Sequence, residues 1–407
     1  DLTAGTVVLS AGDNTTTGTS NIDIDLSSAD ITATADNNVD IANSTASNTT
    51  ATLTSRISGD ITFNQTGGGN VDATAQTTDG GITISNAGGD ITATSVIAGN
   101  SGDILLDTTG GTGSIYVADV ETEGLVTIKS GGGVEEETLS PDPNADINAN
   151  ELIIGSSAGV GVLEIIEIDA NTLAVFDASN SGVYLVDTAG GLTIGTIGAY
   201  SGITTSNGEV SITTNSPLII NAPIDAGAAN IVLTASNSDG YIEVNSSITN
   251  SGAFDITLIA QGVNGSGQSI IMDAANGSIN AGQDAILTAN SADSGDIIVS
   301  SITAGRNITI TADNTGATPT GSILDDDNEN TFLQAGVGGT VSLTADEDIG
   351  SNTGTATIPE GYLDIDMTNS PTLSITTNSG DAYLRFVNNT LHSSDFTGLS
   401  VGGSNIG

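Results

Sequence analysis

Apolar residues alternate with small or polar residues in short runs along most of the chain, and Gly, Asn, Asp and Ser separate these runs. Alternation with a period of two is the pattern of a strand that buries one face, whereas helical spacing is nearly absent. The sequence therefore predicts an all-β protein. Many runs begin with Asp or Asn followed by Ile or Val; examples are Asp30-Ile31-Thr32, Asp60-Ile61-Thr62, Asp90-Ile91-Thr92, Asp103-Ile104-Leu105, Asn230-Ile231-Val232, Asp296-Ile297-Ile298 and Asn307-Ile308-Thr309.

The strand starts recur at regular spacing, which indicates a repeat protein. We expect coils of roughly 20 to 22 residues, each with two or three short strands. Such repeats bury their apolar faces only by stacking, so the sequence predicts a parallel β-helix, or β-solenoid, with equivalent strands about 4.8 Å apart. One track of strand starts runs through Ile22, Ile41, Ile61, Ile82, Ile104 and Val126, a second through Ile31, Leu53, Val71, Ile91 and Ile115, and a later, looser one through Val210, Ile231, Ile256, Ile279 and Ile297.

The two residues that open each strand have separate roles. Asp and Asn side chains can accept a hydrogen bond from the backbone N–H two residues further on, and they tolerate turn conformations. Some repeats have Asp at this position and others have Asn, as Asp60 against Asn70 and Asp296 against Asn307 show. We therefore interpret the position as a requirement of turn geometry and not of charge. The Ile or Val that follows is expected to point inward, where burial is worth about 1.5 to 3 kcal/mol. The core residues predicted in this way include Ile61, Ile82, Ile104, Ile231, Ile297 and Ile308.

Two segments depart from the repeat and divide the chain. Residues 134–150 contain Glu135-Glu136-Glu137, Pro141 and Pro143 and interrupt the alternation; we favour an excursion loop over a boundary between two solenoids. Residues 358–407 hold a third of the aromatic residues. They predict a bulkier terminal coil or an assembly region, because terminal repeats are usually atypical. The solenoid itself is expected over residues 1–133 and 151–357.

The charge of the chain is strongly negative, with 4 Lys and Arg against 49 Asp and Glu and a formal net charge of -45. Nucleic acid is excluded as a partner, because phosphate binding needs a cationic footprint and the basic residues are scattered. A polyanion repels itself unless cations screen it, so stability is expected to depend on salt or divalent ions. The chain has no Cys for disulfides or thiolate metal sites. No apolar run is long enough to predict a membrane-spanning helix.

The repeat is written out in Ser301–Ala312 (SITAGRNITITA), Ser278–Ala289 (SINAGQDAILTA) and Gly339–Gly350 (GTVSLTADEDIG). In these repeats the chain resembles the filamentous haemagglutinin-like large exoproteins of bacteria. The resemblance covers about two thirds of the chain and implies a right-handed parallel β-helix that is exported to the cell surface as an adhesin or fibre. The secretion domain and the cell-binding motifs of that family are not recognisable in this sequence.

Candidate chemistry is sparse. Polysaccharide-active β-helices need clustered carboxylates, a basic residue and stacking aromatics. This chain has one His and no Trp, so we expect no catalytic centre and no cofactor, and we interpret His392 near Asp395 as a surface or capping residue. A run of oxygen ligands is a calcium candidate, although it lacks the Gly that an EF-hand loop requires at its sixth position, and a solvated acidic turn is the alternative. This run contains Asp325, Asp326, Asp327 and Glu329.

Two other patterns point to further ligands. Thr32/Thr34, Thr52/Thr54 and Thr92/Thr94 lie at coil spacing, and a flat Thr ladder can bind ice. The ladder is interrupted at Asp72-Ala73-Thr74, and the β-propensity of Thr explains these pairs as well. Gly67–Asp72 (GGGNVD) partly matches the glycine-aspartate repeat of calcium-binding β-rolls, but an acidic turn is the favoured interpretation.

These features together favour a non-catalytic structural or adhesive surface protein, a β-solenoid segment of an exported bacterial fibre or giant adhesin. Self-association end to end into a filament is expected, because neither end of the sequence shows a polar cap for an open solenoid. A cell-surface or carbohydrate receptor is a candidate partner. The alternatives are an S-layer-like or ice-binding module that depends on cations, and a polysaccharide-active enzyme.

Overall fold

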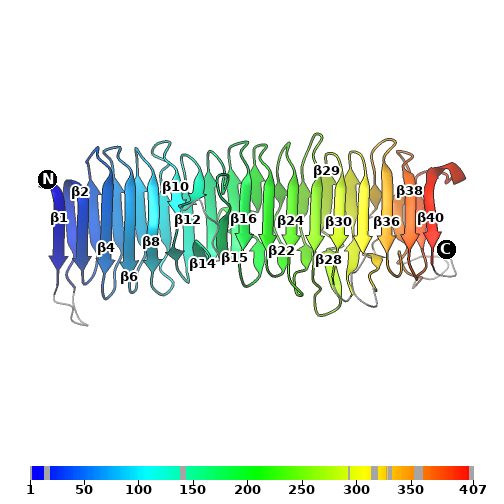
Figure 1. The fold of residues 1–407 in the computed structure, drawn as a ribbon, viewed down its shortest axis with the longest axis horizontal. Helices are drawn as coiled ribbons and strands as arrows, with labels where there is room; N and C mark the ends of the chain where they lie inside the picture. The colour runs from blue at the N-terminus through cyan, green and yellow to red at the C-terminus, as the bar shows by residue number, and fades with distance from the viewer. Residues whose placement is uncertain are drawn as a thin grey trace. The chain divides into compact units, whose positions relative to one another are not determined.

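The computed structural model of the chain describes residues 2–12, 19–137, 144–291, 294–312, 320–326, 328, 332–352 and 361–402. Apart from one turn of 3-10 helix, these residues are all-β, and their parallel strands stack as a β-solenoid of about 16 turns (Figure 1). The predicted all-β solenoid is confirmed. The chain divides into two compact units, Asp1–Thr188 with Ile197–Tyr200 (unit 1) and Ala189–Thr196 with Ser201–Gly407 (unit 2).

Among the described residues of unit 1, strands β1 to β16 mostly begin at the apolar residue after an Asp, Asn or Gly. Their bounds are β1 (Leu2–Ala11), β2 (Ile22–Ala35), β3 (Val39–Asn43), β4 (Thr49–Ser55), β5 (Ile61–Gln65), β6 (Val71–Thr77), β7 (Ile82–Asn86), β8 (Ile91–Ala98), β9 (Ile104–Asp107), β10 (Ile115–Val117), β11 (Val120–Glu121), β12 (Leu125–Lys129), β13 (Val134–Glu136), β14 (Ile147–Ser156), β15 (Ile166–Asp177) and β16 (Val183–Asp187).

The strands of unit 2 are shorter. Their bounds are β17 (Leu192–Ile194), β20 (Ile203–Thr205), β21 (Val210–Thr214), β22 (Leu218–Ile220), β23 (Ile224–Asp225), β24 (Ile231–Ala235), β25 (Ile242–Val244), β26 (Ser247–Thr249), β27 (Ile256–Ala260), β28 (Gln268–Met272), β29 (Ser278–Ala281), β30 (Ala285–Ala289), β31 (Asp296–Val299), β32 (Ser301–Ala304), β33 (Ile308–Ala312), β34 (Ile323–Asp325), β35 (Leu333–Gln334), β36 (Thr340–Ala345), β37 (Leu363–Asp366), β38 (Thr372–Thr377), β39 (Leu384–Val387) and β40 (Phe396–Val401). The 3-10 helix η1 spans Ser393–Asp395, and β18 (Thr196–Ile197) and β19 (Tyr200–Ser201) form a separate hairpin.

Each wall of the solenoid is a parallel sheet in which a strand pairs with its equivalent one coil away. In unit 1 the start of β2 pairs with β3 and its end with β4, so the first coils have two long sides. The second wall divides at β8, whose start pairs with β10 and whose end pairs with β11. Unit 2 has three walls, which run β21-β24-β27-β30-β33-β36-β38-β40, β17-β22-β25-β28-β31-β34 and β20-β23-β26-β29-β32-β35-β37-β39.

Aliphatic side chains form the core of each unit. Ile61, Ile82 and Ile104 are register partners on β5, β7 and β9, and all three are buried. Ile231, Ile297 and Ile308 are buried as well, so every core residue predicted above points inward. Because each coil offers an aliphatic side chain at the same pleat, the side chains stack in continuous rows.

The observed register corrects the predicted tracks. Ile22 and Ile61 both align with Val39, and Ile41 lies two residues further along β3. Leu53 likewise aligns with Ala33 and not with Ile31. A shift of two residues keeps the same side chains inward, which is why the core prediction holds although the register does not. In unit 2 the track through Ile256 continues at Ala285, because Ile279 and Ile297 belong to the other two walls.

Coil length varies along the chain. The predicted spacing holds between Ile61 and Ile82, which are 21 residues apart. In unit 2, by contrast, Ile308 pairs with a residue 33 positions further on, Val341. The additional residues lie in the connections, since the strands of this wall keep five or six residues.

The predicted loop boundary needs correction, whereas the C-terminal segment follows the predicted repeat. Val134–Glu136 is strand β13, which pairs with β10, and β14 begins at Ile147, so the predicted loop 134–150 is too long. Only residues 137–146 lie between these strands, and 138–143 are outside the described residues. The described part of 358–407 continues two walls of unit 2 through β37 to β40, as a terminal coil would, and its role as an assembly region stays a prediction. Tyr362 and Tyr383 pack there at a tilt, with ring centroids 5.8 Å apart.

Candidate functional site

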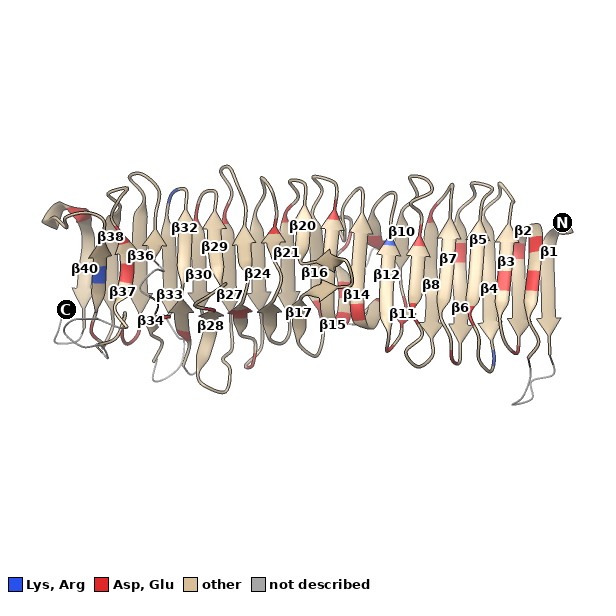
Figure 2. Cartoon of the chain, turned by 180° about the vertical axis from the view of Figure 1, so that it is seen from behind, with Lys and Arg blue, Asp and Glu red and all other residues tan. Residues whose placement is uncertain are grey.

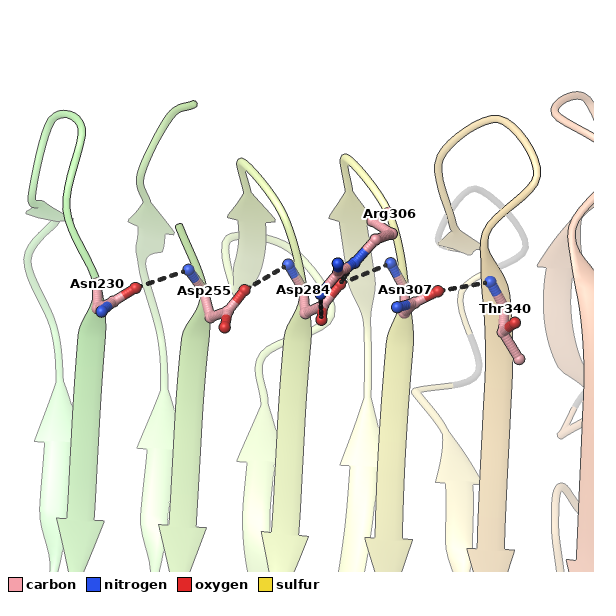
Figure 3. Close-up of polar contacts among 6 residues, drawn as sticks. All are labelled: Asn230, Asp255, Asp284, Arg306, Asn307 and Thr340. Atoms are coloured by element: carbon pink, nitrogen blue, oxygen red, sulfur yellow. Dashed lines mark hydrogen bonds and ion pairs between the residues drawn. The ribbon is translucent and has the colours of Figure 1, made fainter. Parts of the chain in front are cut away.

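The Asp and Asn residues that open the strands form hydrogen-bonded ladders along each unit. In unit 2 the side-chain oxygen of Asn230 accepts the backbone N–H of Asp255 at 3.0 Å, and Asp255 accepts the N–H of Asp284 at 3.0 Å (Figure 3). Asp284 then accepts the N–H of Asn307 at 3.1 Å, and Asn307 accepts the N–H of Thr340 at 3.0 Å. Each side chain therefore satisfies a backbone donor in the next coil.

The same bond recurs in unit 1. The acceptor side chains and their donors are Asn21 with Asn38, Asn38 with Asp60, Asp60 with Gly81, Asn48 with Asn70, Asn70 with Asp90, Asp90 with Ser114, and Asp103 with Leu125. The prediction that these side chains bond within their own turn is wrong at the ladder positions. That local bond occurs elsewhere, as between Asp225 and the N–H of Gly227. A ladder bond needs one acceptor oxygen, which Asp and Asn both supply, so the two residues interchange.

Three arginines each pair with an aspartate in a neighbouring coil. Arg306 donates to both carboxylate oxygens of Asp284, at 2.8 and 2.5 Å, and these hydrogen bonds lower the pKa of Asp284. Arg56 binds Asp36 at 2.6 Å, and Arg385 binds the buried carboxylate of Asp364. Figure 2 shows acidic residues gathered mainly near the ends of strands. Of the three aspartates, Asp284 is also one of the ladder residues named above.

The predicted calcium run lies at the end of β34. Asp325 is the last residue of that strand and aligns with Val299, and both Asp325 and Asp326 are half-buried. Asp326 accepts the N–H of Asn328 at 2.9 Å, the bond of a local turn. Asp327 and Glu329 lie outside the described residues. Calcium binding at this run stays a prediction.

A different carboxylate cluster lies in unit 1. Glu136, Asp146 and Glu167 each place a carboxylate oxygen within 4.8 Å of the other two. Glu136 takes the strand position that the buried Val117 holds one coil earlier, and the N–H of Glu167 donates to Asp146 at 3.1 Å. Oxygens at this spacing suit a hard cation such as Ca²⁺, and without a cation or a proton these charges repel one another. This cluster was not predicted from the sequence, because Glu136 and Asp146 were assigned to a loop.

Glu135, the neighbour of this cluster, holds a loop. Its buried carboxylate accepts the N–H of Leu163 at 2.9 Å. Burial raises the pKa of Glu135, and the backbone hydrogen bonds from Leu163, Val162 and Glu164 partly oppose that change. The loop side chains of Val162 and Leu163 are exposed. The carboxylate therefore fixes an apolar surface loop through its backbone.

Two grooves on unit 1 are large enough for a small molecule. One has a volume of about 410 Å³ and is lined by acidic and amide side chains, with Glu121, Glu123 and Asp169 among them. The other has a volume of about 230 Å³ and is lined by Lys129, Phe176, Tyr200 and several hydroxyls. Neither groove is lined by the histidine.

His392 lies immediately before η1, where it is exposed. Its backbone N–H donates to the carboxylate of Asp395 at 2.6 Å, which is one half of a helix-capping arrangement. The interpretation of His392 as a surface or capping residue agrees with this geometry.

Comparisons of the chain with protein-family models, with curated protein sequences and with solved structures gave no match. No helix among the described residues has the length and hydrophobicity to cross a membrane. The likeness to the filamentous haemagglutinin-like exoproteins therefore rests on the repeats of this sequence.

Proposed function

We propose that the chain is a non-catalytic structural and adhesive protein of the bacterial cell surface, a β-solenoid segment of an exported fibre or giant adhesin that self-associates into filaments. The observation that carries the proposal is the double connection between coils in both units. Equivalent strands pair along every wall, and the Asp/Asn ladders add a side-chain bond where strands begin.

This construction supports a load-bearing and surface-displaying role. Adding a coil extends the fold without a new core, because each coil contacts only its neighbours. Each coil also adds outward-facing side chains at a fixed repeat of about 4.8 Å, which gives an extended surface for contact with a receptor. The net charge of -45 keeps such a surface hydrated and makes its assembly dependent on cations.

Microscopy and adhesion assays test the proposal. Negative-stain images of the purified 407-residue chain at high concentration and high salt should show filaments, and bacteria that display the chain should gain adhesion to host or biofilm surfaces. A monodisperse monomer would refute the filament, and unchanged adhesion would refute the adhesive role. Release of reducing ends from a panel of polysaccharides would overturn the non-catalytic assignment.

A second candidate function, ice binding, is favoured by one observation in unit 2. A row of outward-facing Thr residues, interrupted by Ile259, follows the wall from β21 to β38 and repeats about every 4.8 Å. Regular hydroxyl and methyl groups are what a crystalline ligand such as ice requires. In unit 1 the predicted ladder is shorter, because Thr92 aligns with Asp72 instead of Thr74. The row in unit 2 consists of Thr213, Thr234, Thr288, Thr311, Thr344 and Thr376.

Ice recrystallisation assays separate this candidate from the first. Wild-type protein should slow crystal growth, and Thr344→Lys, within the uninterrupted part of the row from Thr288 to Thr376, should abolish the effect. Thr303→Lys on β32, in another wall, is the matched control and should leave the effect unchanged. Crystals that grow in wild-type protein as in buffer would eliminate ice binding.

A further inference from the structure

A small apolar cluster lies on the outer face of β12, β14 and β15 in unit 1. Ile153 and Ala174 point away from the main core, yet they are only 4% and 0% exposed. Ile197 and Tyr200, from the β18–β19 hairpin, pack over them, and Leu125 packs against the same cluster. The hairpin therefore fixes Tyr200 firmly on the outer surface of this wall.

Tyr200 in turn orients the ring of Phe176. The two rings are stacked, with centroids 5.0 Å apart and an angle of 7° between their planes. The tip of the Phe176 ring lies over Gly155, where a Cβ atom would come within 2.2 Å of Phe176 Cζ. Phe176 is nevertheless 38% exposed. Since Tyr200 covers one face and Gly155 the tip, the exposed area belongs to the remaining face and edges.

The exposed part of Phe176 borders the groove of about 230 Å³. Lys129, Gly155 and Phe176 are register partners on three successive strands, so the Phe176 ring, whose tip lies over Gly155, extends towards the strand that carries Lys129. The hydroxyls of Ser130 and Ser156 donate to backbone carbonyls, while Ser157 is exposed at the rim. The groove thus combines an aromatic platform, a cation and a hydroxyl, in a volume suited to one ring of a ligand.

Lys129 is set apart from the other basic residues. The three arginines are paired with aspartates. Among the described residues, no carboxylate oxygen lies within ion-pair distance of the Lys129 ammonium group. An ammonium group is a compact point charge that suits a carboxylate. The groove therefore offers a cation to an anionic ligand. The register partner of Lys129 on β9 is Asp107, and repulsion from more distant carboxylates is screened beyond about 8 Å at physiological salt.

We propose that this groove binds a hexuronate residue of an acidic glycan. The C–H face of the sugar ring packs on Phe176, its carboxylate pairs with Lys129, and a ring hydroxyl bonds to Ser157. Sites of this kind are mostly apolar, with a few polar groups that fix orientation. The proposal rests on the adhesive function proposed above and names its receptor class.

Titration of the full-length chain with trigalacturonate in EDTA-containing buffer, followed by ligand-observed NMR, tests the proposal. The methyl ester of the same trisaccharide is the uncharged control ligand. EDTA removes calcium, which would otherwise bridge carboxylates of the ligand and the protein. We expect the acid to bind about two- to fivefold more tightly than the ester, the effect of one exposed ion pair. No saturable binding of the acid, or equal affinity for the ester, would overturn the proposal.

Variants assign the binding to this groove. Lys129→Gln should remove the difference between acid and ester, and Phe176→Ala should weaken both ligands by up to about tenfold. Phe176→Leu keeps an apolar side chain over Gly155 but removes the aromatic face, so it serves if the alanine variant fails to fold. Arg306→Gln, which removes an exposed cation from unit 2, should change nothing. Unchanged binding in the Lys129 or Phe176 variants would refute the site. Filaments that persist without glycan binding would leave the structural function intact.

Discussion

Replacement of Asp255 tests the ladder, because one oxygen of this side chain serves the backbone of the next coil. Its Oδ1 accepts the N–H of Asp284 at 3.0 Å, while its own N–H donates to Asn230. Asp255→Ala removes the acceptor and leaves the donor of Asp284 in place. Asp255→Asn keeps an oxygen at the same position and removes only the charge.

The expected magnitudes differ between the two variants. A buried donor that loses its partner costs about 1 to 3 kcal/mol. The bond to Asp284 is only partly buried, so we expect Asp255→Ala to lower the free energy of unfolding by about 1 to 2 kcal/mol. For a unit of this size that corresponds to a fall of about 2 to 8 °C in Tm. Asp255→Asn should stay within about 0.5 kcal/mol of the wild type.

Thermal melts and amide hydrogen exchange measure these effects. Repeat proteins can open locally, so faster exchange in Asp255→Ala should concentrate at the amide of Asp284 and the strand β27. Asp239→Ala is the matched control, since Asp239 is exposed in a turn of the same unit and its loss removes the same charge. Equal destabilisation by Asp255→Asn and Asp255→Ala would show that the acceptor oxygen is not the cause. An Asp255→Ala variant as stable as Asp239→Ala would remove the ladder as a source of stability.

Three further predictions concern the core, pH and salt. Ile82 stacks between Ile61 and Ile104, so Ile82→Asp should lower the free energy of unfolding of unit 1, measured in urea, by more than about 4 kcal/mol. Ile82→Val should lower it by only about 0.5 to 1.5 kcal/mol. Equal losses in the two variants would contradict the inward stacking of Ile82. Burial raises the folded-state pKa of Glu135, so the contribution of this residue to stability is fully present below its unfolded-state pKa and is lost as pH rises through its folded-state pKa. Glu135→Gln should therefore flatten the profile of Tm against pH between these two pKa values. An unchanged profile would show that Glu135 does not cause this pH dependence. Finally, Tm should rise with NaCl concentration, because carboxylates in adjacent coils repel by about 1 kcal/mol or less each, and a constant Tm would mean that the charges are dispersed.

The fold could be predicted from the sequence because strand periodicity survives small errors of register. Ile41 was aligned with Ile22, yet it lies two residues beyond the true partner of Ile22 and still points inward. The number of walls was harder to predict. Ile279 and Ile297 look like continuations of the track through Ile256, but they stack in separate walls, and a pattern of similar strands does not state which strand pairs with which.

The ladder positions were visible in the sequence, but their partners were not. The donor for Asp60 lies 21 residues away, and local bonding two residues on is equally compatible with the sequence. The carboxylate cluster was missed for a related reason. Glu136 stands between Glu135 and Glu137, just before a segment with prolines, and only its alignment with Val117 reveals that it points inward.

The ladder also explains how coil length can change without loss of register. Successive ladder bonds span 25 residues from Asn230, 29 from Asp255, 23 from Asp284 and 33 from Asn307, yet all lie between 3.0 and 3.1 Å. Each bond fixes where the next strand begins, whatever the length of the connection before it. Because Asp and Asn serve this purpose equally, the fold leaves the charge at these positions free. The charge at these positions can therefore vary without loss of the ladder bond, and its cost is the repulsion between carboxylates in adjacent coils, which salt screens.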